Sequence, residues 1–435
     1  MPGRSLLPFA GAALPLLALS VLLGSWKGSC SSWVVLSSLG TVACWGPVLY
    51  LSFLGKAGKG SVLFGILLAL AFRLALFSAP FELSEDAARY HWDGKVLAHG
   101  INPYLYPPKA PELDGLRGDP PDGKVSGISY RTLTVYPPLA ELSFAAGYLL
   151  TPGRLAGLRF LWLLAELAAW LLAFRALSRR GLPLSRFFLL AWCPLLVFQG
   201  YLPGHVDLLA LPFLLLFLEA VDRKKAGPAG AFLALACLVK PFSGLLLPAA
   251  WMVLEKGERR RFAWVFAGLG ILFYLPFLGA GWNLFSSMLL MARKWSFNGS
   301  AAVLLERVMP MGPAHLVSAF FMVASVLYGA RRGRDFLEKA LWAALSFVAF
   351  SATLLPWYLA WILPLLLFRP HPALLAFAAL ASLSDMVLLD FLSKGVWRQP
   401  LWTGVVEYLA FYGLLGWAAW RGHRRKISPS LAART

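Results

Sequence analysis

Charged residues are scarce in this chain of 435 residues: they make up 14% of it, whereas 59% of the residues are hydrophobic and the mean hydropathy is +0.67. No soluble core can bury so much apolar surface, which excludes the two or three soluble domains that the length alone suggests. Apolar runs recur along nearly the whole chain and are too long for the alternating strands of an outer-membrane barrel. We therefore expect an all-α polytopic membrane protein that forms one membrane-embedded domain over residues 1–435.

Several motifs are missing as well. The sequence has no Walker A pattern, no GxSxG, no HExxH and no glycine-rich dinucleotide fingerprint, which argues against ATP-driven pumping and against those enzyme classes. The four cysteines show neither CxxC nor zinc spacing, so we expect no structural metal and no obligatory disulfide. They are Cys30, Cys44, Cys193 and Cys237.

Acidic residues are outnumbered, because 21 Asp and Glu stand against 40 Lys and Arg, and the formal charge is +19. In a soluble protein this charge would raise the question of nucleic acid, but here the basic residues stand in clusters between apolar runs. Such clusters mark cytoplasmic loops, so they orient the chain and indicate membrane lipids, not nucleic acid, as partners. The clusters lie at 56–59, 175–186, 223–225, 259–261, 331–334 and 421–426.

With the N-terminus inside, three predicted spans at about 5–24, 31–54 and 61–79 deliver the chain to the outer face of the membrane. The first span is interpreted as a retained helix, since its apolar stretch is too long for a signal peptide and no cleavage site follows. Residues 80–136 then form a large extracytoplasmic loop, rich in acidic, aromatic and proline residues. Loops of this length are usually functional or disordered, and a helix-compatible stretch at 84–99 indicates order here.

The next segment presents a topology conflict. If both 137–151 and 155–177 crossed the membrane, the arginines that follow would face outside, so we interpret 137–151 as a juxtamembrane or re-entrant helix. The run 227–253 is predicted to form two half-helices that break at Lys240 and Pro241 near the outer side. The other spans are predicted at 185–202, 205–221, 262–280, 313–330, 337–355, 357–369, 372–392 and 402–420, with a second outer loop at 281–312 and about twelve or thirteen membrane segments in all.

Ionisable residues gather where the chain leaves the third predicted span. Asp86, Arg89 and Asp93 are spaced so that they share one face of the expected helix, beside Glu85. A carboxylate in a partly dry pocket can take the proton of an attacking hydroxyl, and an arginine can bind a phosphate through two hydrogen bonds. The alternative is a solvated helix with ordinary ion pairs.

Further charged groups lie near or within the predicted spans. His205 and Asp207 follow Gly204 at the outer end of a predicted span. There they can bind a lipid phosphate and position a sugar. Two such residues alone do not make a metal site. Arg73 and Lys240 lie at membrane depth, where each charge costs about 2.5–3.5 kcal/mol, so each needs a partner such as an anionic lipid head group. Snorkelling to the interface is the alternative. For the remaining acidic residues in or near spans we expect internal pairing: Glu166, Asp385, Asp390 and Glu407.

Several blocks of sequence carry a resemblance to a known family: SEDAARYHWDGKVLAHGINPYLYPP followed by YRTLTVYPPLAEL, and later WCPLLVFQGYLPGHVD, ALACLVKPFSGLLLP and LLPWYLAWILPLL. The first two resemble the first outer loop of the multi-spanning GT-C superfamily of glycosyltransferases. They are most similar to bacterial polyprenol-phosphate-mannose-dependent mannosyltransferases and related family 87 and family 39 proteins. Gln199 departs from the acidic residue that related proteins often have at that place.

The resemblance implies that a sugar, expected to be mannose, passes from a polyprenyl-phosphate donor to a lipid or glycan acceptor, with inversion and without a metal or other cofactor. An acidic residue of the first loop is the implied base: Asp86 first, Glu85 as its competitor and Asp93 as a helper. Basic side chains would stabilise the charge that grows on the leaving phosphate, and the candidates are Arg73, Arg89, Arg131, His205 and Lys240. Sugar or acceptor contacts are expected from Tyr90, Trp92, Asn102, Tyr104, Tyr136, Asp207, Trp357 and Tyr358, whose aromatic members can alternatively be interfacial belt residues.

Two other functions stay open at the level of sequence. Many spans, a broken helix and intramembrane charges also suit a secondary transporter or lipid flippase, for which an inverted repeat is the sign, and we find no convincing repeat. A non-catalytic membrane scaffold would not need carboxylates, arginine and histidine converging on the outer face. We therefore favour a hexosyltransferase of the cell membrane with an extracytoplasmic active site.

Overall fold

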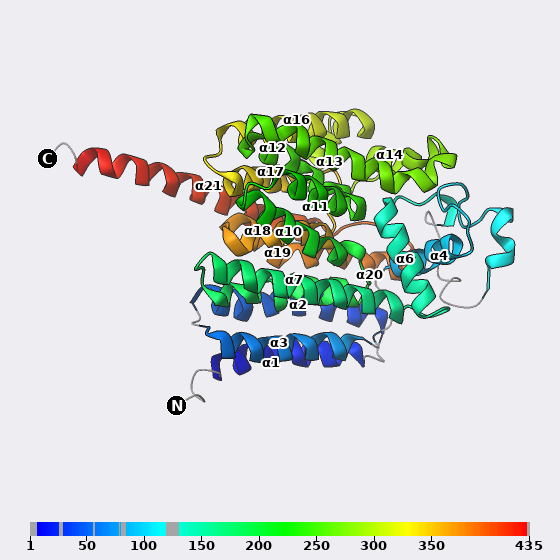
Figure 1. Cartoon of the computed structure of the whole chain (residues 1–435). Coiled ribbons are helices and arrows are strands. Elements are labelled where there is room, and N and C mark those ends of the chain that lie inside the picture. Colours follow the sequence, from blue (N-terminus) through cyan, green and yellow to red (C-terminus); the bar gives the residue numbers. More distant parts are fainter. Residues whose placement is uncertain are drawn as a thin grey trace.

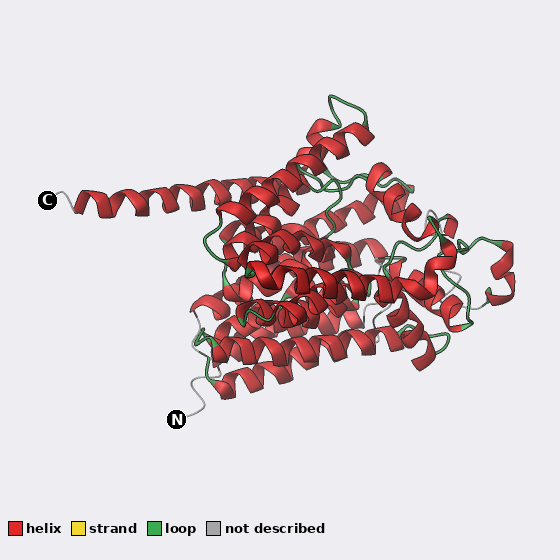
Figure 2. Cartoon of the chain, turned by 45° about the horizontal axis from the view of Figure 1, so that its top comes forward, coloured by secondary structure: helices red, strands yellow, loops and turns green. Residues whose placement is uncertain are grey.

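Helices make up the regular structure of the described residues, and no strand occurs among them (Figure 2). The computed structural model describes residues 7–25, 29–54, 57–77, 79, 84–118 and 130–432. Parts of the predicted outer loop, 80–83 and 119–129, lie outside the described residues, as do the side chains of Cys30 and of the basic cluster after Arg421. The prediction of an all-α protein is confirmed.

The first helices of the chain are α1 (Leu7–Gly24), α2 (Cys30–Leu54) and α3 (Lys59–Leu76), and α1 packs against the other two (Figure 1). Next come α4 (Asp86–Ala98), the 3₁₀ helix η2 (Pro111–Leu116), α6 (Pro138–Leu150) and the long α7 (Ala156–Arg179). Helix α4 confirms the helix expected over 84–99. It lies against α6 at the end of the molecule opposite the end from which the last helix projects.

The rest of the chain alternates short 3₁₀ helices with α-helices. They are η4 (Leu184–Phe187), α8 (Phe188–Ala191), α9 (Pro194–Tyr201), η5 (Val206–Ala210), α10 (Leu211–Asp222), α11 (Ala226–Val239), η6 (Pro241–Leu246), α12 (Leu247–Val253), α13 (Lys256–Tyr274), η7 (Leu275–Ala280), α14 (Asn283–Lys294), α15 (Ala301–Leu305), α16 (Met311–Arg332), α17 (Phe336–Phe350), η8 (Pro356–Ile362), α18 (Leu363–Phe368), α19 (Pro372–Leu380), η9 (Ala381–Met386), α20 (Val387–Lys394) and α21 (Leu401–Ala432).

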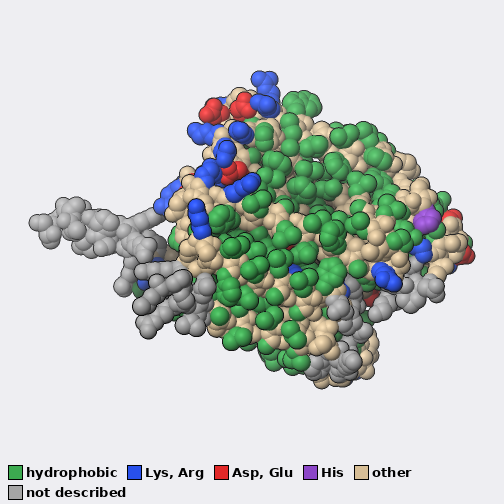
Figure 3. Space-filling view, turned by 60° about the horizontal axis from the view of Figure 1, so that its bottom comes forward, with side chains coloured by type: hydrophobic (Ala, Val, Ile, Leu, Met, Phe, Trp, Pro, Cys, Tyr) green, Lys and Arg blue, Asp and Glu red, His purple; other side chains and the backbone are tan. Residues whose placement is uncertain are grey.

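Seven helical segments of the described chain are long and apolar enough to span a membrane: Ser31–Phe53, Lys59–Leu76, Ala156–Arg179, Leu184–Tyr201, Lys256–Ala280, Met311–Arg332 and Pro372–Lys394. Shorter apolar helices accompany them, among them Pro138–Leu150 and Ala226–Val239. Figure 3 shows one face on which hydrophobic side chains predominate, with Lys and Arg gathered at one edge. This surface suits lipid contact, and the chain is a multi-pass membrane protein. The count of twelve or thirteen segments, which includes short ones, stays a prediction.

Polar contacts show which helix ends lie together. Arg179 near the end of α7 pairs with Asp222 at the end of α10, Nη2 to Oδ2 2.9 Å. Near the start of α7, Arg159 donates to the backbone oxygens of Phe77 and Tyr201 at 2.5 and 2.9 Å. Helix α7 therefore runs the length of the bundle, from the end where α4 lies to a basic end. This is the arrangement expected if 155–177 crosses the membrane and 137–151 does not.

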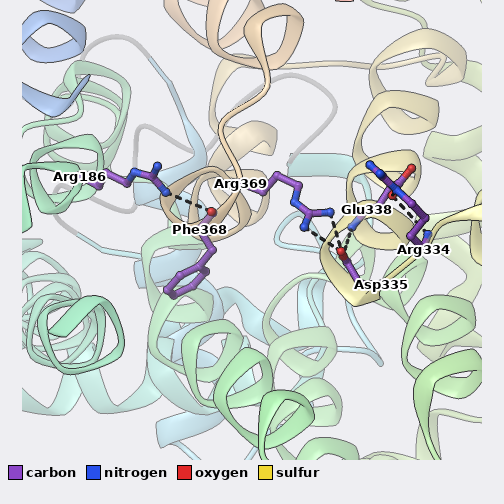
Figure 4. Close-up of polar contacts among 6 residues, drawn as sticks. All are labelled: Arg186, Arg334, Asp335, Glu338, Phe368 and Arg369. Carbon is purple, nitrogen blue, oxygen red and sulfur yellow. Dashed lines mark hydrogen bonds and ion pairs between the residues drawn. The ribbon is translucent and has the colours of Figure 1, made fainter. Parts of the chain in front are cut away.

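The basic end is joined by further contacts (Figure 4). Arg369, after α18, binds both carboxylate oxygens of Asp335, the N-cap of α17, at 2.8 and 2.7 Å. Arg186 of η4 donates to the carbonyl of Phe368 at 3.2 Å. Basic clusters that are far apart in the sequence thus meet at one end of the molecule, as the positive-inside pattern predicts.

Three 3₁₀ helices lead to the end of the bundle where α4 and α6 lie. Each of η5, η6 and η8 is followed by a Leu-Pro pair that opens an α-helix, since proline needs no N–H partner in a first turn. The predicted break at Lys240 and Pro241 is confirmed, because α11 ends at Val239 and Lys240 has an extended backbone. Stretches of 3₁₀ helix inside helical segments often occur at functional sites. Here His205 precedes η5, Lys240 precedes η6 and Trp357 lies in η8.

Candidate active site

Asp86, the first residue of α4, faces His205, which directly precedes η5. Asp86 Oδ2 lies 3.2 Å from His205 Nδ1, and the Tyr90 hydroxyl donates to the same carboxylate oxygen at 3.4 Å. The dipole at the N-terminal end of α4 also favours an anion there. Gly204 has a φ of 77°, a left-handed conformation that favours glycine and turns the chain from α9 into η5.

The protonation state of Asp86 follows from these neighbours. Burial by itself raises the pKa of the carboxyl group, but the hydrogen bond with His205 and the charges of His205 and Lys240 outweigh it. The pKa of Asp86 therefore lies below its ordinary value of 3.8, and the group is a carboxylate at neutral pH. Its side chain is still 29% exposed, so an incoming hydroxyl can reach it.

Lys240 and Asp207 form a buried ion pair close to this carboxylate. Lys240 Nζ lies 2.9 Å from Asp207 Oδ2, and the two side chains are 12% and 7% exposed. The ammonium also lies over the rings of Tyr136 and Tyr358, with Nζ 5.6 and 5.0 Å from the ring centres, within the range of cation–π attraction. A lysine ammonium has three N–H donors, so its bond to Asp207 leaves donors for a second anion.

Aromatic rings hold the groups around the carboxylate in place. The His205 ring lies flat on Trp357 of η8, with ring centres 3.4 Å apart and an interplanar angle of 16°. Tyr90 stacks on Phe144 of α6 at 4.4 Å and meets Tyr136 edge-on at 4.9 Å. Such packing locks rotamers, and both groups that contact the carboxylate are therefore fixed before any substrate binds.

A cavity of about 10 Å³, the space that one water molecule needs, lies against His205 and Asp207. Gln199 and Trp357 also face it, and most of the remaining wall is apolar, from Leu195, Leu196, Gly200, Leu208 and Ala360. Pockets that bury a whole ligand usually have about 300–1,000 Å³, so this cavity by itself holds neither a sugar ring nor a lipid chain.

Arg89 and Asp93, which the sequence placed with Asp86, take part in a separate buried cluster. Arg89 Nε lies 2.8 and 2.7 Å from the two Asp93 carboxylate oxygens. Glu141 of α6 interacts electrostatically with Asp93 and accepts a hydrogen bond from the Thr134 hydroxyl at 2.5 Å. Burial, and then the charge of Asp93, raises the pKa of Glu141 well above its ordinary value. Sequence reasoning missed Glu141, although a lone acidic residue in an apolar helix is a signal for a buried polar contact.

Arg73 lies in α3, deep in the bundle, and its side chain reaches α7. Its guanidinium binds both carboxylate oxygens of Glu166, Nε to Oε2 3.1 Å and Nη2 to Oε1 2.6 Å, and both side chains are fully buried. The Tyr201 hydroxyl donates to the same carboxylate at 2.8 Å. The partner that Arg73 requires is therefore a protein carboxylate, and Arg73 has no place in the phosphate site proposed below. The internal pairing expected for Glu166 is confirmed.

Other predicted residues lie in the outer segment around α4. Trp92 is buried in a small hydrophobic core with Ala88, Val96 and Leu113. The Tyr104 hydroxyl donates to the carbonyl of Tyr136 at 2.6 Å, and Asn102 donates to a carbonyl of η7 at 3.2 Å. These contacts anchor the segment that carries Asp86. Two further candidates flank it: Glu85 is half-buried and Arg131 is exposed.

One protein-family model covers most of the residues of this site. Residues 134–356 match the family model described as glycosyltransferase family 87, which is just over half of the chain. His205, Asp207, Lys240 and Tyr136 lie inside the match, and Asp86 precedes it. No curated protein and no solved structure matches the chain.

Proposed function

We propose the following reaction for this chain, which belongs to glycosyltransferase family 87 and is therefore a glycosyltransferase acting on a sugar donor and an acceptor. A hexose, with mannose as the expected sugar, moves from a polyprenyl-phosphate donor to a hydroxyl group of a lipid or glycan acceptor, with inversion. The observation that carries this proposal is the convergence of Asp86, His205 and Lys240 from three distant parts of the chain.

Asp86 is the proposed base. The acceptor oxygen attacks the anomeric carbon of the donor sugar, its proton passes to the Asp86 carboxylate, and the bond between that carbon and the phosphate oxygen breaks. The electron pair of this bond leaves with the polyprenyl phosphate, so one displacement inverts the anomeric centre. Asp86 suits this role because it is deprotonated, reachable and held by His205 and Tyr90.

Lys240 and His205 are the proposed groups for the leaving phosphate. Negative charge grows on the phosphate as the bond breaks, and a cation fixed in a water-poor site stabilises the transition state more than the ground state. Lys240 is such a cation, whereas burial lowers the pKa of His205 and favours its neutral form. Lys240 is already positioned by Asp207 and by two tyrosine rings, so it needs little reorganisation when a phosphate binds. Arg89 and Arg131 remain secondary candidates, and the ion pair with Asp93 gives Arg89 a structural partner.

We propose the outer face of the cell membrane as the location of the reaction. The site lies at the end of the bundle opposite the one where the basic clusters around Arg179 and Arg369 meet. Basic loops stay in the cytoplasm, which supports an extracytoplasmic site open to lipid-linked donors of the outer leaflet.

The test uses purified protein in detergent or liposomes, a panel of radiolabelled polyprenyl-phosphate hexoses and a lipid extract as acceptor. We expect a new labelled glycolipid with at least one donor. Asp86→Asn should reduce its formation about 10²- to 10⁴-fold, because general-base catalysis contributes that much. Asp114→Asn is the matched control in the same outer segment, since the Asp114 side chain is 61% exposed and pairs only with a neighbour three residues away among the described contacts.

Full activity of Asp86→Asn together with loss in Glu85→Gln or Asp93→Asn would move the base to another residue of the segment. Absence of transfer with every donor, combined with solute flux into the liposomes, would contradict the proposed reaction and favour the transporter.

A further inference from the structure

One buried histidine outside the Asp86 cluster joins three consecutive helices of the chain. His315, in the second turn of α16, lies between the end of α14 and the residue that follows α15. Its Nδ1 atom lies 2.9 Å from the backbone oxygen of Ala292, and its Nε2 atom lies 2.7 Å from Glu306 Oε1. The His315 side chain is 6% exposed and the Glu306 side chain is 19% exposed.

Both neighbours of the imidazole are groups that accept hydrogen bonds. A neutral imidazole has a single N–H, whereas the carbonyl oxygen of Ala292 and the carboxylate of Glu306 can only accept. Both contacts are therefore hydrogen bonds only while His315 and Glu306 together hold one further proton, on the imidazole or on the carboxyl group. When that proton is lost, a ring nitrogen without hydrogen faces an acceptor on one side, whichever tautomer forms.

Glu306 is the carboxylate that faces His315. Helices α12, α14, α15 and α17 pack against α16, and neither α12 nor α15 contains a charged residue. The charged residues of α17 lie near its start, at the opposite end of α16, where Lys339 Nζ donates to the carbonyl of Ala330 at 2.6 Å. The other charged side chains of α14 and of the residues after α15 are exposed cations, which accept no proton: Arg293, Lys294 and Arg307.

The contacts of His315 flank a segment that supports η8. The Phe297 N–H donates to the carbonyl of Ala352 at 3.1 Å, and the Leu354 N–H donates to the carbonyl of Phe297 at 2.8 Å. Helix η8 begins two residues after Leu354 and carries Trp357, on which the His205 ring lies. His315 therefore holds both ends of the segment against which the start of η8 is paired.

We propose that the proton shared by His315 and Glu306 makes this contact a pH-dependent lock. With the proton bound, the lock holds the end of α14 and the residue after α15 on α16. As the pH rises and the proton is lost, one of the two hydrogen bonds breaks and the segment between them loosens. Histidine is the side chain that ordinarily changes its charge between about pH 5 and 8, which sets the range to compare. The inference goes beyond the proposed reaction and does not depend on it.

The experiment measures amide hydrogen exchange of peptides from 293–309 in the full-length protein in detergent, at about pH 5.5 and about pH 8.5. Rates are corrected for the intrinsic pH dependence of exchange, and wild type is compared with His315→Gln and Glu306→Gln. His99→Gln is the matched control, because His99 is exposed and its Nδ1 atom contacts the carbonyl of Lys95 in its own helix.

Wild-type peptides should exchange about 5-fold faster at the higher pH, the effect of one lost hydrogen bond. Glu306→Gln should be protected at both pH values, since an amide N–H can donate to the neutral Nε2 of His315 without a shared proton. His315→Gln should exchange equally fast at both pH values, because it removes the imidazole. His99→Gln should keep the wild-type difference.

Equal protection of the wild type at both pH values, or a pH difference that persists in Glu306→Gln, would overturn the lock. Peptides from α7 are the internal reference, and faster exchange there to the same extent would mean a global change and also overturn it. If His315→Gln is not recovered folded, the comparison of wild type with Glu306→Gln decides.

Discussion

Lys240, at the start of η6, and Asp207, in η5, carry opposite charges. Both side chains are largely buried, so few water molecules can solvate these charges. Each ion loses hydration on folding, and the attraction between them, together with the tyrosine rings around Lys240, offsets that loss. Removing one member therefore leaves the other as an uncompensated charge, whereas removing both charges leaves neutral groups that can still hydrogen-bond. Stability and the proposed phosphate binding depend on this pair in different ways, and mutation can separate the two.

Lys240→Gln should destabilise the protein by about 3–5 kcal/mol, because it leaves Asp207 buried without its cation. The double variant Lys240→Gln with Asp207→Asn should recover most of that loss but not the transfer activity, since the phosphate site still lacks its cation. Thermal unfolding in detergent and the glycolipid assay together measure both effects. Equal unfolding midpoints for the single and double variants would contradict the argument.

At the scale of elements, α4 reaches the site because it lies very close to α6. A Cβ added at Gly94 would overlap the backbone of Phe144, so glycine is required for this approach. The Arg89 and Asp93 pair and the buried Glu141 stand at the same contact. The position of Asp86 at the start of α4 is thus set by packing just over two helical turns away.

Gly94→Ala should push α4 away from α6 and reduce transfer by more than 10-fold, because small displacements of a catalytic group cost about 10²-fold in rate. The overpacking should also cost about 1–3 kcal/mol in stability. Gly115→Ala is the control, since a Cβ there meets open space. If Gly94→Ala kept the wild-type transfer rate and the wild-type unfolding midpoint, the close approach of α4 to α6 would not be needed for activity or stability.

At the scale of the whole molecule, two opposite ends differ in chemistry. Arginines near the ends of α7, α16 and α18 meet acidic partners at one end, and the cluster of Asp86, His205 and Lys240 lies at the other. An apolar surface separates them (Figure 3). A protein of this kind has one orientation in the bilayer, and that orientation decides on which side of the membrane the Asp86 cluster lies.

Single cysteines test this orientation in a variant whose four native cysteines are replaced by alanine. Gly115→Cys should react with a membrane-impermeant maleimide on intact cells, and Lys225→Cys, exposed next to α11, should react only after permeabilisation. The reverse pattern would place the site in the cytoplasm and contradict an outer-leaflet donor. Labelling of the denatured protein controls for the presence of both cysteines.

Several site residues were predictable from the sequence because they break an apolar pattern. Asp86, His205 and Lys240 each place an ionisable group near a predicted span, where a charge is expensive and needs a reason. The side chains that these residues contact were not predictable from the same pattern. The spacing on one helix allows Arg89 to pair with either Asp86 or Asp93. In the structure, Arg89 binds Asp93 and Asp86 contacts His205.

Hydrophobicity and the distribution of basic residues are properties of local sequence, and by themselves they determined that this chain is helical, crosses the membrane many times and gathers its basic loops at one end. The choice of partner for each buried charge is a property of packing, because it joins side chains that lie far apart in the chain. Only the tertiary structure decided that Glu166 neutralises Arg73, that Asp207 holds Lys240 and that Gln199 pairs with Asp385.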